Sequence, residues 1–352
     1  MARAARPSAG RARLAAVAGA LSAALGLAPA AQAPSPGRID VLKAIGGLSP
    51  DAVGQFREPI GFEQHPNGLY VVFDRRGHAV FTVDPATQST FKLIEIGGEQ
   101  GRIIEPGAFD VARDGTIVVA DAPGGRERIQ QFDILGRWTS GFRLPGRAAP
   151  RITVEGLALS GVGTMAAIDG GVALNLPETG ALVTEYSIEG VPLRSIGRLR
   201  ATGHEADRDL HLAFNAAMPL PHPKGGYVVV FLAGPPAFRR YDARGELLYE
   251  RVIQGRELDP LLAALPTRWP RRDVNGMELP LVVPTVRTAA LDPAGRLWVS
   301  FTIPFTYVFD DEGEKIRTVQ FRAAGLVSPT SVSFARDGRI LVTPGCYAFR
   351  AP

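Results

Sequence analysis

Short apolar runs alternate with turns that end in glycine along most of the chain. The runs follow the turns in HPNGLYVVFD (65–74), RDGTIVVAD (113–121), GVGTMAAID (161–169), PKGGYVVVF (223–231), PAGRLWVSF (293–301) and RDGRILVTP (336–344). Apolar, β-rich runs of this length, bounded by Gly, Pro, Asn or Asp, predict strands. The repeat therefore predicts six copies of one unit, anchored at Gly68, Gly115, Gly163, Gly226, Gly295 and Gly338.

A second turn follows each of the first five copies. Its clearest forms are FDILG (132–136), YDARG (241–245) and FDDEG (309–313), with weaker versions in VDPAT (83–87) and YSIEG (186–190). Asp at the start of such a turn accepts hydrogen bonds from the backbone, and Gly at its end adopts positive φ. Each unit is thus predicted to contain four antiparallel strands.

Six four-stranded units predict an all-β fold, a six-bladed β-propeller, as a single domain over residues 34–352. The last copy is followed by too few residues to complete four strands. The segment RIDVLKAIG (38–46) is similar to the fourth strands of other units. We therefore expect this N-terminal strand to complete the last blade and close the ring, which would remove exposed sheet edges.

The second unit carries a family resemblance. Its sequence EPGAFDVARDGTIVVADAPGGRERIQQFDILGRW (105–138) resembles an NHL repeat, while the first and last units match the pattern less closely. The resemblance implies a six-bladed propeller. It implies no single chemistry, because NHL-type propellers include protein- and RNA-binding modules, lactonase-like hydrolases and an amidating lyase.

The first 33 residues have the pattern of a secretory signal peptide. Four arginines (Arg3, Arg6, Arg11 and Arg13) precede an Ala/Leu/Gly run that ends in Ala31-Gln32-Ala33. This three-part pattern predicts cleavage and export, to the periplasm or outside the cell. The apolar run is too short to span a bilayer comfortably, so no membrane span is expected after cleavage.

Charge and cysteine content narrow the set of partners. The chain has 39 Lys and Arg against 35 Asp and Glu, and four of the arginines lie in the predicted signal peptide. The remainder is formally neutral, which argues against a nucleic-acid partner. Cys346 is the only cysteine, so no intramolecular disulfide forms, and we expect a buried structural thiol in a monomeric protein.

Two long connections interrupt the repeat, at residues 198–222 and 255–284. Each contains a stretch with helical character, His204 to Phe214 and Asp259 to Leu265. Both contain too many apolar residues for disorder, and long connections in compact domains are usually functional or disordered. We interpret them as a partial lid over one face, with simple packing additions as the alternative.

Candidate site residues come from strand beginnings. Glu58, Glu105 and Glu155 are placed near the mouth of the predicted channel, where carboxylates could bind Ca²⁺ or act as acid and base. The alternative is that each is a solvated residue at the start of a strand. Arg287 could balance them or hold an anion, and His222 is the one histidine placed to face the channel.

A different set of acidic residues repeats with the units. Asp74, Asp121 and Asp169 end three of the apolar runs. Repetition within one chain favours an architectural role, such as bonding to turn backbone or to a following arginine (Arg126 or Arg128 for Asp121). The sequence thus predicts an exported propeller that binds a protein, peptide or small ligand through its lidded face without catalysis. The alternative is a metal-dependent hydrolase or lyase, lactonase-like, with Glu58 and Glu105 as metal ligands.

Overall fold

The computed structural model describes residues 38–146, 152–154, 157–159, 162–274 and 276–351. The predicted signal peptide lies outside these ranges, as does Glu155. In the part of the chain that the structure describes, no helix is both long enough and apolar enough to cross a membrane. The described residues belong to one compact unit.

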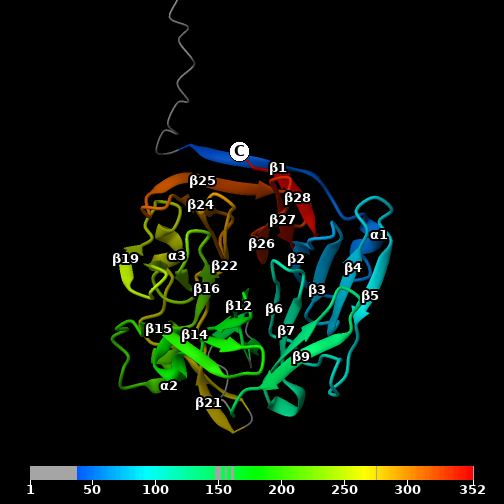
Figure 1. Cartoon of the computed structure of the whole chain (residues 1–352). Coiled ribbons are helices and arrows are strands. Elements are labelled where there is room, and N and C mark those ends of the chain that lie inside the picture. The colour runs from blue at the N-terminus through cyan, green and yellow to red at the C-terminus, as the bar shows by residue number, and fades with distance from the viewer. Residues whose placement is uncertain (1–37, 147–151, 155–156, 160–161, 275, 352) are drawn as a thin grey trace, which may run out of the picture. The chain divides into compact units, whose positions relative to one another are not determined.

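Four sheets of four antiparallel strands follow one another along the chain and stand around a ring (Figure 1). The first two sheets consist of β2 (Pro59–Gln64), β3 (Tyr70–Asp74), β4 (Ala79–Val83) and β5 (Thr90–Ile94), then β6 (Ala108–Val111), β7 (Ile117–Asp121), β8 (Arg128–Phe132) and β9 (Trp138–Arg143). The next two consist of β12 (Met165–Ile168), β13 (Gly171–Leu174), β14 (Ala181–Ser187) and β15 (Pro192–Arg198), then β16 (Ala217–Pro221), β17 (Tyr227–Phe231), β18 (Ala237–Tyr241) and β19 (Leu247–Val252).

An eight-stranded sheet completes the ring. Its strand order is β22 (Val286–Leu291), β23 (Leu297–Phe301), β24 (Thr306–Phe309), β25 (Lys315–Arg322), β1 (Ile39–Gly47), β28 (Tyr347–Arg350), β27 (Arg339–Thr343) and β26 (Ser331–Phe334). Smaller elements lie in the connections: the two-stranded sheets β10 (Ile152–Val154) with β11 (Leu157–Leu159) and β20 (Arg271–Val274) with β21 (Met277–Pro280), and the helices α1 (Pro50–Val53), α2 (Arg208–Phe214) and α3 (Asp259–Ala263).

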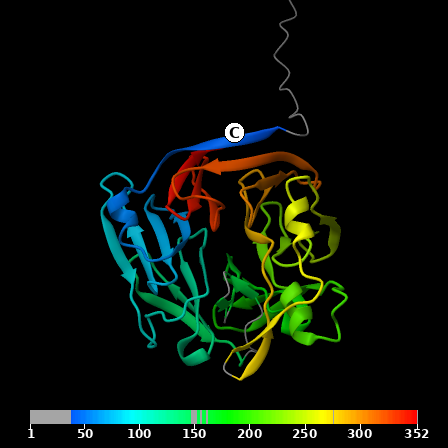
Figure 2. The same ribbon diagram turned by 180° about the vertical axis from the view of Figure 1, so that it is seen from behind.

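The all-β ring agrees with the sequence prediction, but the count of six separate blades is wrong. The expected pairing of the N-terminal strand with the end of the chain is present: Ala44–Gly47 pair antiparallel with β28. The first half of the same strand, Ile39–Lys43, also pairs in parallel with β25. Figures 1 and 2 both show β1 lying along β25 and then along β28. Because β1 is nine residues long, it satisfies two sheet edges at once and joins eight strands into one sheet.

The third sheet is shifted along the sequence from its predicted position. Met165–Ile168 was expected to be a second strand, but it is the first strand of its sheet, and Gly171–Leu174 is the second. The turn between them contains Asp169 and Gly170, whose φ of 74° suits glycine. The apolar segment before it forms the separate β10–β11 pair. The repeat there is interrupted by an unexpected insertion.

Apolar side chains between neighbouring sheets form the core. The second strands β3, β7, β17 and β23 are buried along their whole length, because each is covered on both faces. Between the first two sheets, Phe73 stacks on Phe109 with ring centroids 5.3 Å apart. Gly61 allows this close approach, since a Cβ there would lie 2.9 Å from the Phe109 ring.

Two of the three recurring aspartates have the architectural role expected of them. Asp74 accepts hydrogen bonds from the N–H groups of Arg57, Glu58 and Gly77. Asp121 accepts from the N–H of Ile104 and forms a buried ion pair with Arg128, with Nε to Oδ1 at 2.7 Å. Asp169 differs from both, because the shift of the third sheet places it in a turn between the first and second strands.

Candidate ligand site on the inner strands

The first strand of each four-stranded group faces the middle of the ring. These inner strands are β2, β6, β12, β16, β22 and β26 (Figure 1). Together they contain three charged residues, namely Glu63, Asp110 and Arg287. The remaining residues of the six inner strands, here called the inner wall, are apolar or uncharged.

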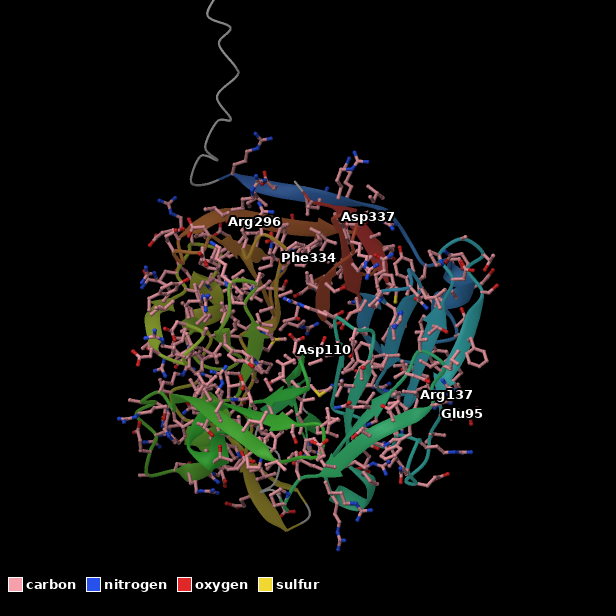
Figure 3. All side chains as sticks on the ribbon, viewed as in Figure 1. Glu95, Asp110, Arg137, Arg296, Phe334 and Asp337 are labelled. Carbon is pink, nitrogen blue, oxygen red and sulfur yellow. The ribbon has the colours of Figure 1, made fainter. Side chains whose placement is uncertain are left out.

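Glu63 and Asp110 form an acidic pair on neighbouring inner strands. Glu63 lies on β2 and Asp110 on β6, and the negative charge of Asp110 acts directly on the Glu63 carboxylate. Each residue stands five positions before the glycine that ends the turn to its second strand, Gly68 or Gly115. Figure 3 shows Asp110 near the middle of the ring, whereas Glu95 lies at the periphery.

Backbone N–H groups hold both carboxylates in place. Asp110 Oδ2 accepts a hydrogen bond of 2.6 Å from the N–H of Ala167 on β12, and Oδ1 accepts one of 2.9 Å from the N–H of Val111. Glu63 also interacts with the Val111 N–H. Asp110 therefore bonds to the backbone of the next sheet and of its own strand, and Glu63 bonds to the backbone of the next sheet. Strand packing fixes the position of both carboxylates.

The environment of the pair favours the protonated carboxyl groups. Burial raises the pKa of Asp110 to about 6, even though the N–H groups of Ala167 and Val111 lower it. Burial and the charge of Asp110 raise the pKa of Glu63 well above its usual range. Two like charges this close in a poorly solvated place resist ionising together. The pair can therefore hold a proton near neutral pH or exchange it for another cation.

Glu63 and Asp110 were not among the residues predicted from the sequence. The predicted residues stand at strand beginnings, while this pair lies in the second half of its strands. A signal was present: both are acidic residues inside otherwise apolar inner strands, at the same offset from their turn glycines. An acidic residue at such a position indicates a functional site because the strand around it is apolar.

The predicted candidates Glu58 and Glu105 differ in their surroundings. Glu58 is half-buried and pairs with Arg75, with Nη2 to Oε1 at 2.5 Å, while Arg76 Nε lies 3.9 Å from its other oxygen. Glu105 is exposed and has a φ of 52°. Arg287 stands at the second position of β22, half-buried, on the same inner wall as the acidic pair.

His222 lies in the turn from β16 to β17, and its side chain is only 1% exposed. Its Nδ1 accepts hydrogen bonds from Arg240 Nη2 at 2.9 Å and from the Lys224 N–H at 3.2 Å. Its Nε2 therefore carries the proton and faces Asp311 Oδ1 at 3.1 Å. Burial and the charge of Arg240 lower the pKa of His222, so the ring is neutral at pH 7. This histidine ties two sheets together and has both nitrogens engaged.

The two insertions pack against each other. The predicted helical stretches form α2 and α3. Asp207 caps α2 by accepting a hydrogen bond from the Leu210 N–H. Phe214 from the first insertion packs edge-on against Trp269 from the second, at 5.2 Å between ring centroids. Asp207 and Arg271 form an ion pair across the same contact, at 2.5 Å. The two segments thus form one connected layer, here called the insertion layer, in the connections that lead into β16 and β22.

Cys346 is fully buried in the turn between β27 and β28 and packs in the core beside the first sheet. Burial raises the pKa of its thiol to about 12, so the thiolate is not formed near neutral pH. This agrees with the expected structural thiol.

Comparisons with known proteins give no family. No protein-family profile and no curated protein matches this sequence. Solved structures of similar chain path include a catalytically inactive virginiamycin B lyase from Staphylococcus aureus with quinupristin, at TM-score 0.49 and 11% identity over 84% of this chain and 80% of that one. A selenomethionine-substituted virginiamycin B lyase from the same organism has TM-score 0.46 and 11% identity, over 86% and 81% of the chains. A protein of unknown function from Bacteroides caccae has TM-score 0.41 and 12% identity, over 80% of each chain. Similarity at this level assigns neither ligand nor reaction to this chain, and the NHL type stays a prediction.

Proposed function

We propose that this protein is an exported binding module that holds the cationic group of a peptide or small ligand against Glu63 and Asp110. The observation that carries the proposal is the acidic pair itself, on an inner wall with few other charges. Export rests on the N-terminal sequence pattern alone.

An ammonium or guanidinium group suits the pair for an electrostatic reason. The two carboxylates repel each other when both are ionised, and each is partly buried. A bound cation removes the repulsion and donates charge-assisted hydrogen bonds to oxygens that have lost water. A neutral ligand gains neither advantage.

The insertion layer and the acidic pair lie toward different ends of the inner strands. The insertion layer belongs to the connections that lead into β16 and β22, so it lies at the end of the ring where inner strands begin. The acidic pair lies toward the opposite ends of its own strands. A ligand entering past the insertion layer would reach Arg287 near the start of β22 before it reached the carboxylates.

The metal-dependent hydrolase or lyase remains an alternative with less support. Ca²⁺ takes six to eight oxygen ligands. Within the described ranges, no group of three or more His, Cys, Asp and Glu side chains is arranged to hold a metal ion. Glu58, one of the two metal ligands foreseen from the sequence, is paired with Arg75.

The test compares two peptides that differ in one charge. Binding of N-acetyl-Gly-Lys-Gly amide and of its norleucine counterpart would be measured by calorimetry on the full chain and on a Glu63→Gln/Asp110→Asn variant. We expect the lysine peptide to bind at least about tenfold more weakly to the variant, and more tightly to the unchanged protein as pH rises through 6. Glu95→Gln, an exposed carboxylate on the periphery, is the matched control. Equal affinity for both peptides would refute the proposal.

A further inference from the structure

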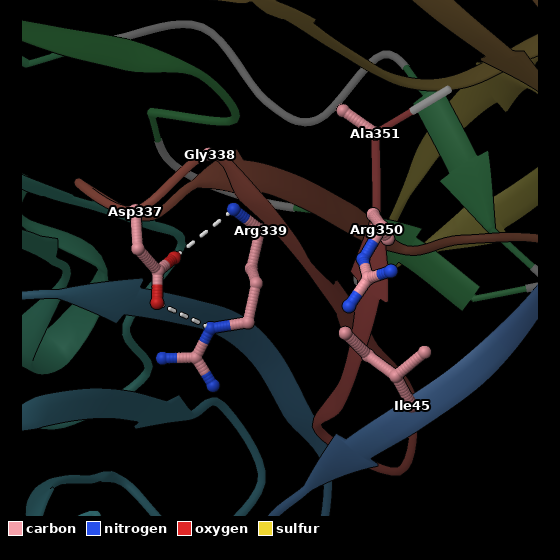
Figure 4. Close-up of a pocket in the computed structure, with 6 residues that line it drawn as sticks. All are labelled: Ile45, Asp337, Gly338, Arg339, Arg350 and Ala351. Atoms are coloured by element: carbon pink, nitrogen blue, oxygen red, sulfur yellow. Dashed lines mark hydrogen bonds and ion pairs between the residues drawn. The ribbon is translucent and has the colours of Figure 1, made fainter.

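A cavity of about 440 Å³ lies where the two ends of the described chain meet. It is lined by Ile45 from β1, by Asp337, Gly338 and Arg339 from the turn into β27, and by Arg350 and Ala351 at the end of β28. Figure 4 shows these six residues around the space. The cavity belongs to the eight-stranded sheet and shares no residue with the inner-strand acidic pair.

Two arginines stand directly opposite each other in this cavity. Arg339 and Arg350 are partners across the antiparallel β27–β28 pair, so their side chains leave the same face of the sheet. Like charges in this position destabilise a sheet unless something of opposite charge lies between them. Arg339 and Arg350 are the last residue pair of the β27–β28 hairpin, so the repulsion acts at its end.

The cavity contains one carboxylate for its two guanidinium groups. Asp337 Oδ2 accepts from Arg339 Nε at 2.6 Å, and Oδ1 accepts from the Arg339 N–H at 3.1 Å (Figure 4). Among the described residues, the Arg350 side chain has no hydrogen bond or ion pair. Arg350 is exposed and thus keeps its donors available to a ligand.

Apolar surface lies beside the free guanidinium. The Ile45 side chain is 52% exposed, and exposure of a large aliphatic side chain to water is unfavourable. Ala351 follows Arg350 and also lines the cavity. A guanidinium binds a carboxylate through two parallel N–H bonds. The combination fits an acid that carries an aliphatic or aromatic group.

We propose that this cavity binds a small organic carboxylate, with the carboxylate on Arg350 and the apolar group against Ile45. Such a ligand would screen the Arg339–Arg350 repulsion and would contact β1 and β28 together. It would therefore stabilise the closure of the ring, since a ligand that binds only the folded state raises stability by mass action.

The experiment uses benzoate as the probe and measures the thermal midpoint of the full chain at fixed ionic strength, with inorganic phosphate as the comparison anion. We expect benzoate to raise the midpoint in the unchanged protein and in Arg244→Gln, which removes an exposed arginine from a distant turn. Arg350→Gln should abolish the shift and, without ligand, should melt no lower than the unchanged protein.

A second variant covers the case in which Arg350→Gln fails to fold. Ile45→Glu leaves both arginines in place but puts a carboxylate on the exposed side of β1, and it should also abolish the benzoate shift. A benzoate shift that survives in both variants, or a shift given by phosphate and not by benzoate, would overturn the proposal. The Glu63→Gln/Asp110→Asn variant should keep the benzoate shift, which separates this site from the inner-strand site.

Discussion

Glu63 and Asp110 occupy the same place in successive sheets, each five residues before its turn glycine; burial raises the pKa of both carboxyls, and the charge of Asp110 raises that of Glu63 further. The same repeat that builds the ring therefore brings two acidic groups together.

Asp110→Asn should flatten the dependence of stability on pH. A carboxyl whose pKa is raised on folding binds protons more tightly in the folded state, so its contribution to stability is complete below pH 4 and is lost as pH rises through about 6. The loss is about 3 kcal/mol at most for a shift of this size, and roughly 1–2 after solvent screening. Asparagine does not titrate and removes this slope.

The measurement is urea unfolding at pH values from 4 to 8. Asn can accept only one of the two backbone hydrogen bonds made by Asp110, so a constant loss of about 1 kcal/mol is expected at low pH. Glu95→Gln should leave the slope unchanged. An unaltered slope in Asp110→Asn would show that the carboxyl is ordinary.

Arg128→Ala should be far more destabilising than Arg137→Ala, although both arginines make ion pairs of 2.7 Å. The Arg128 and Asp121 side chains are 8% and 0% exposed, while those of Arg137 and Asp133 are 73% and 27% exposed. Removing Arg128 leaves a buried carboxylate without its partner, at a cost of about 3–5 kcal/mol. Removing Arg137 should cost less than about 1 kcal/mol.

Chemical denaturation of the two variants checks this difference. Arg128 also donates to the carbonyls of Gly98 and Arg102, so its loss should loosen the connection between β5 and β6 as well. Similar losses in both variants would contradict the dependence on burial.

Gly47→Ala should destabilise the ring closure. Gly47 pairs with Tyr347, and a Cβ there would lie 2.3 Å from the Cys346 carbonyl oxygen in a backbone with φ of 141°. We expect a loss of about 2 kcal/mol or more, because both backbone strain and a steric clash are introduced. Faster hydrogen exchange in β28 would locate the effect.

The control for that variant is Gly163→Ala. A Cβ at Gly163 has no neighbour within 4 Å, so its effect should stay within about 0.5 kcal/mol. If both substitutions were equally mild, β1 would not hold the chain ends as described.

Trp269→Ala should loosen the insertion layer without unfolding the ring. Trp269 contacts Phe214 and packs on a small cluster with Leu210, Ala213 and Val282, separate from the cores between sheets. An aromatic contact of this kind adds about 0.5–1.5 kcal/mol beyond its buried area. Limited proteolysis within residues 255–284 should become several-fold faster.

Trp138→Ala is the matched change on an outer strand, where the side chain is 38% exposed. It should not alter cleavage of the insertion. Unchanged proteolysis in Trp269→Ala would mean that the two insertions are held by other contacts, such as Asp207 with Arg271.

The sequence by itself determined the repeating unit. Turn chemistry and apolar periodicity are local, and they predicted the buried second strands, the architectural roles of Asp74 and Asp121, and the helices near 208–214 and 259–263. The pattern also predicted that the N-terminal strand meets the end of the chain, because the last unit lacked a strand.

Only the tertiary structure decided the rest. The pairing of Ile39–Lys43 with β25 and the meeting of Glu63 with Asp110 both join segments far apart in sequence. The alternation of side chains along a strand determines on which face of the sheet a side chain lies, but not which residue of another sheet it contacts there. The charge of a carboxylate depends on that neighbour and on the water that packing excludes, and neither is written in local sequence.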